Sequence, residues 1–314
     1  MPLTLTDLAA PTTRVPRDGR GRPLVVPKHG GKPQALTRAT TYIDCVEDKS
    51  ALNAWRQRMT LIGAAKEPSL LERLKDVDPA TKEGKAALDG LTERAVEVAG
   101  ANRKRERGTH LHTLSEYVDR GEELPPGTSP ADLADMAAYK VATMDFDVVA
   151  VEQFVVVDQL GVGGTFDRML RYSGPGPDGH PIEGLFIGDL KTGSVRYGGL
   201  KMAAQLAVYS RGELYDHTVC PVDDRDLKAL AAWRRREVPA SVAAAAYSPI
   251  PEVNQDWGII IHLPAGEARC TLYWADLRVG WEAARLALDI RRIRGAKAAL
   301  VSFDRGTDSA SRLI

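Results

Sequence analysis

The sequence predicts an α/β protein, because a β-rich centre lies between segments with helical periodicity. Residues 148–157, Val-Val-Ala-Val-Glu-Gln-Phe-Val-Val-Val, have the density of β-branched side chains that is typical of a buried strand. A second apolar run, residues 185–191, follows a loop rich in Gly and Pro. The order helix, three strands, helix, strands, helix indicates one α/β domain with a helical N-terminal extension.

The N-terminal third divides into an arm and an extension. Residues 1–36 are rich in Pro, Gly and basic side chains, which favours a flexible basic arm. This arm either remains solvated or contacts a nucleic-acid strand, and both interpretations stay open. Residues 37–102 form the predicted helical extension, with apolar side chains at helical spacing from 37 to about 65 and again beyond 66.

A further helix is expected around residues 109–117, where His112 and Glu116 share a face by their i,i+4 spacing and His110 does not. A histidine on a helix is by itself usually structural, and Glu116 is interpreted as a surface or supporting residue. Residues 130–143 predict another helix. Four basic side chains precede His110 and either form a solvated face or contact DNA phosphates: Arg103, Lys104, Arg105 and Arg107.

The first two central strands are joined by a turn. The glycine-rich residues 161–164 lead from the strand at 148–157 into a strand at 165–172, and the pair is predicted to be an antiparallel hairpin. These glycines lack the Lys-Ser/Thr that completes a phosphate-binding loop, so no ATP site is expected.

The C-terminal part continues the alternation of helices and strands. A helix over 200–215 carries Gln205 and Tyr209 on one face. The remaining elements are an irregular helix at 229–246, strands at 257–263 and 268–274, a helix at 277–294 capped by Asp276, and a loose tail at 301–314.

The composition excludes several classes of protein. The zero net charge argues neither for nor against nucleic acid as a partner. Three cysteines, distant from one another in the sequence, fit free thiols in a reducing cytoplasm better than a disulfide framework. No apolar run reaches about 18 residues, and the N-terminus lacks the apolar core of a signal peptide. We therefore expect a cytoplasmic protein without a membrane segment.

Two acids and a lysine in the centre suit metal-assisted hydrolysis of a phosphodiester. Period-2 alternation puts Asp189 and Lys191 on one face of their strand and Leu190 on the other, and Asp167 begins the neighbouring strand. A divalent ion held by carboxylates neutralises phosphate charge and activates a bound water, and Mg²⁺ prefers a few carboxylates over a full protein cage. The alternative is an ordinary ion pair within a strand, which Asp189 and Lys191 alone do not exclude.

Four segments in order give the sequence a resemblance to a known family. They are Arg107-Gly108-Thr109-His110-Leu111-His112, Gly164-Thr165-Phe166-Asp167, Asp189-Leu190-Lys191 and Gln205-Leu206-Ala207-Val208-Tyr209. These segments resemble the motifs of the PD-(D/E)XK nuclease superfamily in its RecB-like branch, which includes CRISPR-associated exonucleases and related proteins of actinobacterial phages. The resemblance implies a restriction-endonuclease-like core, a central mixed sheet flanked by helices, within residues 103–300.

The resemblance also implies a role for each matching residue. His112, Asp167 and Asp189 are expected to bind Mg²⁺ or Mn²⁺, with Leu190 as a ligand through its backbone carbonyl. Lys191 is the expected catalytic residue. Gln205 and Tyr209 are expected near the site and the DNA backbone. Glu152 lies where the branch often carries an acidic residue and is a further candidate ligand.

One feature of the branch is missing. Some RecB-like exonucleases bind an iron–sulfur cluster through four cysteines, whereas Cys45, Cys220 and Cys270 are single and widely spaced. We therefore expect no iron–sulfur cluster.

The expected function is a divalent-metal-dependent DNA exonuclease that acts on ends or single strands. The resemblance associates it with phage DNA replication or recombination in the host cytoplasm, either as a homo-oligomer or with a phage recombination partner. An endonuclease or nickase of the same superfamily is one alternative. A non-catalytic DNA-binding protein on the same fold is the other.

Overall fold

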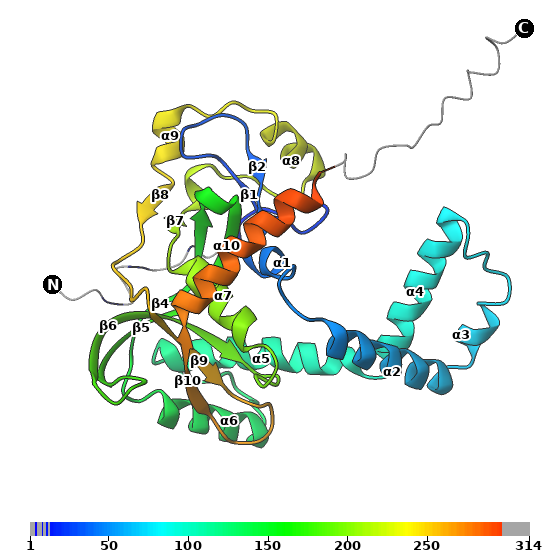
Figure 1. Ribbon diagram of the computed structural model, residues 1–314, viewed down its shortest axis with the longest axis horizontal. Helices are drawn as coiled ribbons and strands as arrows, with labels where there is room; N and C mark the ends of the chain where they lie inside the picture. The colour runs from blue at the N-terminus through cyan, green and yellow to red at the C-terminus, as the bar shows by residue number, and fades with distance from the viewer. Residues whose placement is uncertain (1–3, 5–7, 9–10, 12, 297–314) are drawn as a thin grey trace, which may run out of the picture.

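Figure 1 shows the computed structural model, which describes residues 4, 8, 11 and 13–296. Its strands are β1 (Leu24–Val25), β2 (Gln34–Ala35), β3 (Thr37–Arg38), β4 (Asp147–Val157), β5 (Val162–Pro175), β6 (Pro181–Lys191), β7 (Glu213–Tyr215), β8 (Tyr247–Pro249), β9 (Trp257–His262) and β10 (Thr271–Asp276). Its α-helices are α1 (Ala39–Ile43), α2 (Ser50–Lys66), α3 (Ser69–Glu72), α4 (Lys82–Val98), α5 (Ala101–Asp119), α6 (Pro130–Ala142), α7 (Gly199–Tyr209), α8 (Leu227–Trp233), α9 (Ala240–Ala244) and α10 (Leu277–Arg294). Short 3₁₀ helices lie at Asp158–Leu160 and His217–Val219.

The centre of the fold is a large mixed sheet. Its strand order is β10-β9-β6-β5-β4-β7-β8, with β3 added beside β5. The β6–β9 and β3–β5 pairs are parallel and the other pairs are antiparallel. The predicted α/β class and mixed central sheet are therefore confirmed, as is the antiparallel pairing of β4 with β5. The turn between them lies at residues 158–161 and not at the predicted 161–164, because Gly163 and Gly164 already pair with β4.

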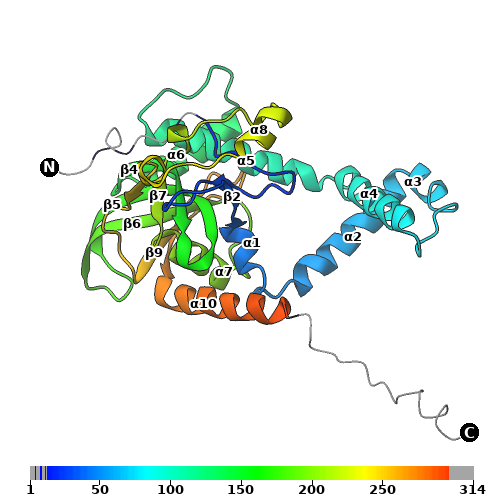
Figure 2. The ribbon, with the colours of Figure 1, turned by 90° about the horizontal axis from the view of Figure 1, so that it is seen from above.

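Helices cover both faces of this sheet (Figure 2). Helices α1, α7 and α10 pack on one face, where the main hydrophobic cluster lies. The last two approach closely, since a Cβ added at Gly280 of α10 would lie 2.3 Å from the carbonyl oxygen of Ala203 in α7. Helices α5 and α6 cover the other face with a second cluster, in which Leu111 and Leu114 of α5 pack with Leu190 of β6. The sheet is thus held between two apolar layers.

The N-terminal segment corrects the prediction of a flexible arm for residues 13–36, whereas most of residues 1–12 lie outside the part of the chain that the structure describes. Its part from 13 to 36 packs on the body: Leu24 and Val26 share a cluster with Trp233 of α8. Val15 and Val25 belong to a further cluster that reaches Phe154 of β4. The reason is the apolar sequence Leu24-Val25-Val26, which buries too much hydrocarbon to stay in water.

The helical extension is smaller than the predicted 37–102. Tyr42 and Ile43 of α1 are fully buried in the main core, so the extension begins at α2. Helices α2, α3 and α4 project from the body (Figures 1 and 2). Their own buried cluster consists of Leu70, Leu91 and Ala95.

Three further comparisons concern the C-terminal half. The predicted helix 200–215 ends at Tyr209, because residues 213–215 instead pair with β4 as β7. Asp276 caps α10 as predicted, and its carboxylate accepts from the backbone N–H of Arg278 and of Val279. The predicted tail at 301–314 lies outside the described residues.

Within residues 13–296, none of the helices combines the length and apolarity needed to cross a bilayer.

Candidate active site

Three carboxylates lie in one row across β4, β5 and β6. Arg168 pairs with the residue before Glu152 in β4 and with the residue before Asp189 in β6. Continuing both registers by one residue puts Asp167 of β5 opposite Glu152 on one side and Asp189 on the other. Directly opposed residues of antiparallel strands have Cβ atoms about 4.5–5.5 Å apart, so the row concentrates negative charge.

The backbone is distorted at this row. Glu152 has a φ of 53°, in the left-handed region that side chains other than Gly rarely occupy. The neighbouring strand β5 is irregular as well. Residues on one face of a regular strand are an even number of positions apart, but Phe166 and Met169, three apart, belong to the same core cluster. The alternation of side chains between the two faces is therefore interrupted between these residues. Such distortion costs of the order of 1–3 kcal/mol and is typical of functional sites.

Asp167 joins β5 to β6 and α5. Its Oδ2 accepts a hydrogen bond from the backbone N–H of Leu190 at 2.8 Å. The same oxygen lies 3.4 Å from Nδ1 of His112, which α5 presents to the sheet. The structure therefore brings together three residues that are predicted from separate motifs, and it uses the backbone of Leu190 to orient a carboxylate.

Asp189 is held by side chains of β6 and α7. Lys191 Nζ pairs with Asp189 Oδ2, which confirms that the two residues share a face. The Gln205 amide donates to Asp189 Oδ1 and to the Tyr209 hydroxyl, each at 3.2 Å, which confirms the predicted common face of α7. Asp189 is only 2% exposed, so its Oδ2 is shielded from water and has the Lys191 ammonium as its partner.

Burial and crowding shift the pKa values of the carboxyl groups. Burial raises the pKa of Asp189 to about 7; the charge of Asp167 adds to this rise, and Lys191 opposes it. The pKa of Glu152 also rises to about 7, because the surrounding protein displaces water and because the charges of Asp167 and Glu116 are nearby. The Glu152 side chain is nevertheless exposed to solvent. The row is thus short of positive charge.

The two basic groups of the site shift in opposite directions. Burial lowers the pKa of His112 and outweighs the charge of Asp167, so the imidazole is neutral at pH 7 with a lone pair to share. Burial would also lower the pKa of Lys191, but Asp189 and Asp167 outweigh it and raise that pKa, so the ammonium is retained.

Two glycines of the motifs permit close approach of the helices. A Cβ added at Gly108 of α5 would lie 2.7 Å from the Thr192 hydroxyl, just beyond Lys191. A Cβ at Gly164 of β5 would lie 2.7 Å from the ring of Tyr209. A side chain at position 164 would push against the ring of Tyr209, and one at position 108 would require the Thr192 side chain to move.

The row borders a cleft of ≈ 460 Å³. Glu116 lines it together with His112 and Glu152 and pairs with Arg120, and its interpretation as a surface or supporting residue stays a prediction. The i,i+4 spacing from His112 was the signal for its position. The full lining is Arg14, Arg105, Gly108, Thr109, His112, Thr113, Glu116, Glu152 and Thr192.

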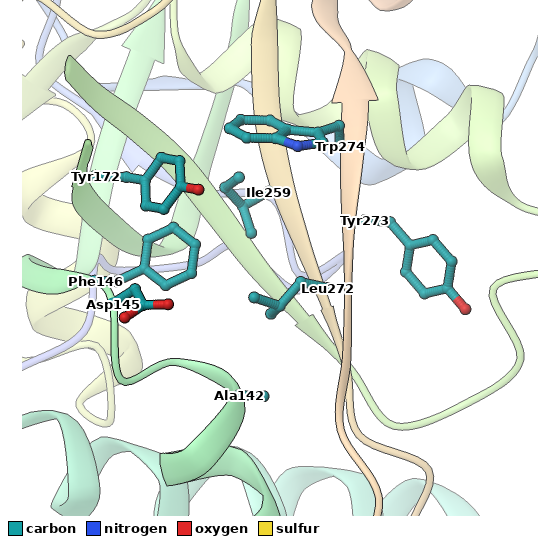
Figure 3. A pocket seen from close by; sticks show the side chains of 8 residues that line it. All are labelled: Ala142, Asp145, Phe146, Tyr172, Ile259, Leu272, Tyr273 and Trp274. Carbon is teal, nitrogen blue, oxygen red and sulfur yellow. The ribbon is translucent and has the colours of Figure 1, made fainter. Parts of the chain in front are cut away.

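A small aromatic cavity of ≈ 120 Å³ lies apart from the carboxylate row (Figure 3). Phe146, Tyr172 and Trp274 line it from three segments, whereas Tyr273 points to the other side of β10. None of the predicted site residues contributes to its lining.

The four basic residues before His110 differ in their surroundings. Arg107 forms ion pairs with Asp132 and, at 3.3 Å, with Asp135, both in α6, so it fixes α5 to α6, and its contact with DNA stays a prediction. Arg105 lines the cleft, and Arg103 is exposed outside it. The side chain of Lys104 lies outside what the structure describes.

A buried network beneath the row had no signal in the sequence. Arg168 is 1% exposed, and its Nε donates to Asp119 Oδ2 of α5 at 2.6 Å. The other oxygen of Asp119 accepts from the Tyr139 hydroxyl of α6 at 2.6 Å, and Arg168 also contacts the Ser115 hydroxyl. The residue after Asp167 therefore ties both helices to β5.

The side chains as they stand do not form a complete metal site: within the described residues, no three His, Cys, Asp or Glu groups are close enough to share one ion. The two carboxylates are nevertheless of the donor type that Mg²⁺ and Mn²⁺ prefer, and the neutral imidazole would add one softer nitrogen donor. Asp189 Oδ2 is buried and pairs with the Lys191 ammonium, so a cation bound to this oxygen would take the place of that ammonium.

Comparison with known proteins adds no assignment. Neither the family models nor the curated proteins that were searched give a match to this chain. The chemistry of the site therefore has to be inferred from its side chains.

Proposed function

We propose that the protein is a divalent-metal-dependent deoxyribonuclease of the PD-(D/E)XK type, and that it acts as an exonuclease. The observation that carries this proposal is the convergence of four sequence motifs on one carboxylate row. His112 lies against Asp167, and Lys191 and Gln205 both contact Asp189, although these residues come from α5, β5, β6 and α7.

Asp167, Asp189 and His112 are the proposed ligands of Mg²⁺ or Mn²⁺, with the Leu190 carbonyl and Glu152 as further donors. Bound there, the ion would supply Lewis-acid stabilisation of the phosphate and a water of lowered pKa. The raised pKa values of Asp189 and Glu152 support this proposal: burial raises both and the charge of Asp167 adds to the rise, and a bound cation would offset both effects by favouring the ionised carboxylates.

The remaining residues orient these groups and the substrate. Lys191, protonated and beside Asp189, is placed to donate a hydrogen bond to a phosphate oxygen or to the attacking water once an ion replaces it on the carboxylate. Gln205 fixes the rotation of the Asp189 carboxylate, and Tyr209 in turn fixes Gln205. The backbone N–H of Leu190 fixes the Asp167 carboxylate in the same way, by donating a hydrogen bond to it.

Removal of divalent ions is expected to abolish cleavage. With excess EDTA, release of labelled nucleotides from linear DNA should stop, and Mg²⁺ or Mn²⁺ should restore it. Thermal unfolding should show that EDTA leaves the protein folded. Full activity in EDTA would contradict the proposal.

Cleavage at limiting Mg²⁺ is expected to rise between pH 6 and pH 8. Asp189, with a pKa raised to about 7, holds its proton at pH 6, and a proton on the carboxylate competes with the ion. Below pH 7 the apparent metal affinity should therefore fall about tenfold per pH unit for each proton displaced. Titration of the rate against Mg²⁺ at each pH checks this, and a metal affinity independent of pH would contradict it.

The same pKa makes the metal-free protein less stable at high pH. Because the pKa of Asp189 in the fold exceeds its ordinary value of 3.8, this group favours the fold most below pH 3.8. Its contribution is lost as the pH rises through about 7, and added Mg²⁺ should restore stability there.

A further inference from the structure

A second cleft, of ≈ 600 Å³, continues from the first along the N-terminal segment. The two clefts share Arg14, Glu116 and Glu152 in their linings. The second cleft is also lined by Arg17 and His217, so basic and polar groups follow the carboxylate row in one direction.

Two of the arginines at this cleft, Arg14 and Arg17, form no ion pair with any described residue, although the charge of Arg14 acts to lower the pKa of Glu152. Within the described residues, neither Arg14 nor Arg17 forms an ion pair with a carboxylate, and neither does Arg38 of β3. Partial burial lowers the pKa of Arg17, and the positive charges of Arg38 and Arg14 lower it further. By contrast Arg120, in the same lining, pairs with Glu116 at 2.8 Å. Arg17 donates a hydrogen bond to the Gly21 carbonyl at 2.9 Å, which leaves its charge unneutralised. Guanidinium groups that repel one another and have no ion pair would be stabilised by an anion.

The segment that carries these arginines is fixed in place. Val15 is buried between the two arginines, and the Thr13 hydroxyl lies 2.7 Å from Nε2 of His217. The Pro16 carbonyl accepts from the backbone N–H of Leu24 at 2.8 Å. The arginines are therefore presented by an ordered support, which reduces the entropy lost when an anion binds.

We propose that Arg14 and Arg17 bind internal phosphates of the substrate strand next to the phosphodiester that is cut. This proposal rests on the proposed nuclease function, since it places the strand along both clefts. A row of carboxylates repels a polyanion, and two arginines at its border offset that repulsion without entering the row. Thr13 and the neutral His217 complete a polar lining for the sugar–phosphate backbone.

The salt dependence of DNA binding tests the proposal independently of catalysis. Fluorescence anisotropy with a single-stranded oligonucleotide in EDTA gives the dissociation constant over a range of KCl concentrations. The double variant R14A/R17A should bind about tenfold more weakly per arginine. The slope of log K against log salt should fall in magnitude by about 1.4, or about 0.7 for each lost phosphate contact.

Two control variants make the result specific. R14K/R17K retains the charge, so its salt slope should stay close to that of the wild type while its affinity falls through loss of the bidentate contact. Arg20→Ala changes an exposed arginine of the same segment that lines neither cleft, and it should bind like the wild type. Unchanged affinity and slope in R14A/R17A would overturn the proposal.

Two further experiments distinguish an internal from a terminal phosphate contact, and the phosphate subsite from the nuclease function. Oligonucleotides with a 5′-phosphate, a 3′-phosphate or neither should lose affinity equally in R14A/R17A; a loss confined to one phosphorylated end would mean a terminal contact and overturn the internal assignment. In cleavage assays, KM of R14A/R17A should rise more than kcat falls. If the wild type binds DNA in this arginine-dependent way but cleaves none with Mg²⁺ or Mn²⁺, the nuclease proposal fails and the phosphate subsite stands.

Discussion

Replacement of Lys191 by Ala is expected to lower the rate of DNA cleavage by about 10²–10⁴, the range lost when a positioned acid–base group is removed. Lys191 pairs with Asp189 and is protonated, so it is the cation closest to the proposed phosphate position. Asp189→Asn should cause a loss of at least about 10³, because it removes a proposed metal ligand but keeps the oxygen that accepts from Gln205.

Rates are measured by single-turnover release of end label with saturating Mg²⁺. Asp178→Asn, in the exposed loop between β5 and β6, is the matched control and should retain full activity. Circular dichroism and the midpoint of thermal unfolding check that each variant is folded. Folded Lys191→Ala or Asp189→Asn protein with the wild-type rate would refute the proposed site.

Replacement of Arg168 by Met is expected to lower the free energy of unfolding by about 3–5 kcal/mol, the cost of leaving one partner of a buried ion pair uncompensated. Asp119 would lose the guanidinium that offsets its burial, which already raises its pKa. Since Arg168 also contacts Ser115, the variant should loosen α5 and with it His112.

Urea unfolding measures this loss. Arg269→Met is the control: Arg269 pairs with Glu267 at 2.8 Å, but both side chains are more than half exposed, and the loss should stay below about 1 kcal/mol. R168M/D119L, which removes both charges, should recover part of the stability lost in Arg168→Met. Equal losses in Arg168→Met and Arg269→Met would contradict the role assigned to the buried network.

The strands and the motif residues were predictable because their signals are local. The β-branched run of β4 and the Asp189–Lys191 spacing determine a strand and a shared face without reference to distant residues. Likewise, the four-residue spacing of Gln205 and Tyr209 places both side chains on the face of α7 that meets Asp189.

Features that depend on tertiary partners were not predictable. Arg168 has the sequence character of a solvent-exposed arginine, and only Asp119, 49 residues away, explains its burial. The ion pairs of Arg107 with Asp132 and Asp135 of α6 likewise depend on residues distant in the sequence. The N-terminal segment is basic in composition, but its Val15 and Leu24 are buried against residues far along the chain.

The most direct test of the central claim is a time course of wild-type and Asp189→Asn protein on end-labelled linear DNA and on closed circular single-stranded DNA, with Mg²⁺ or Mn²⁺. We expect the wild type to shorten the linear DNA and to leave the circle intact, and Asp189→Asn to cut neither. Cleavage of the circle by the wild type would contradict exonuclease action and assign an endonuclease to the same residues. Absence of cleavage of both substrates by the wild type, or equal cleavage by Asp189→Asn, would contradict a nuclease site at Asp167, Asp189 and Lys191.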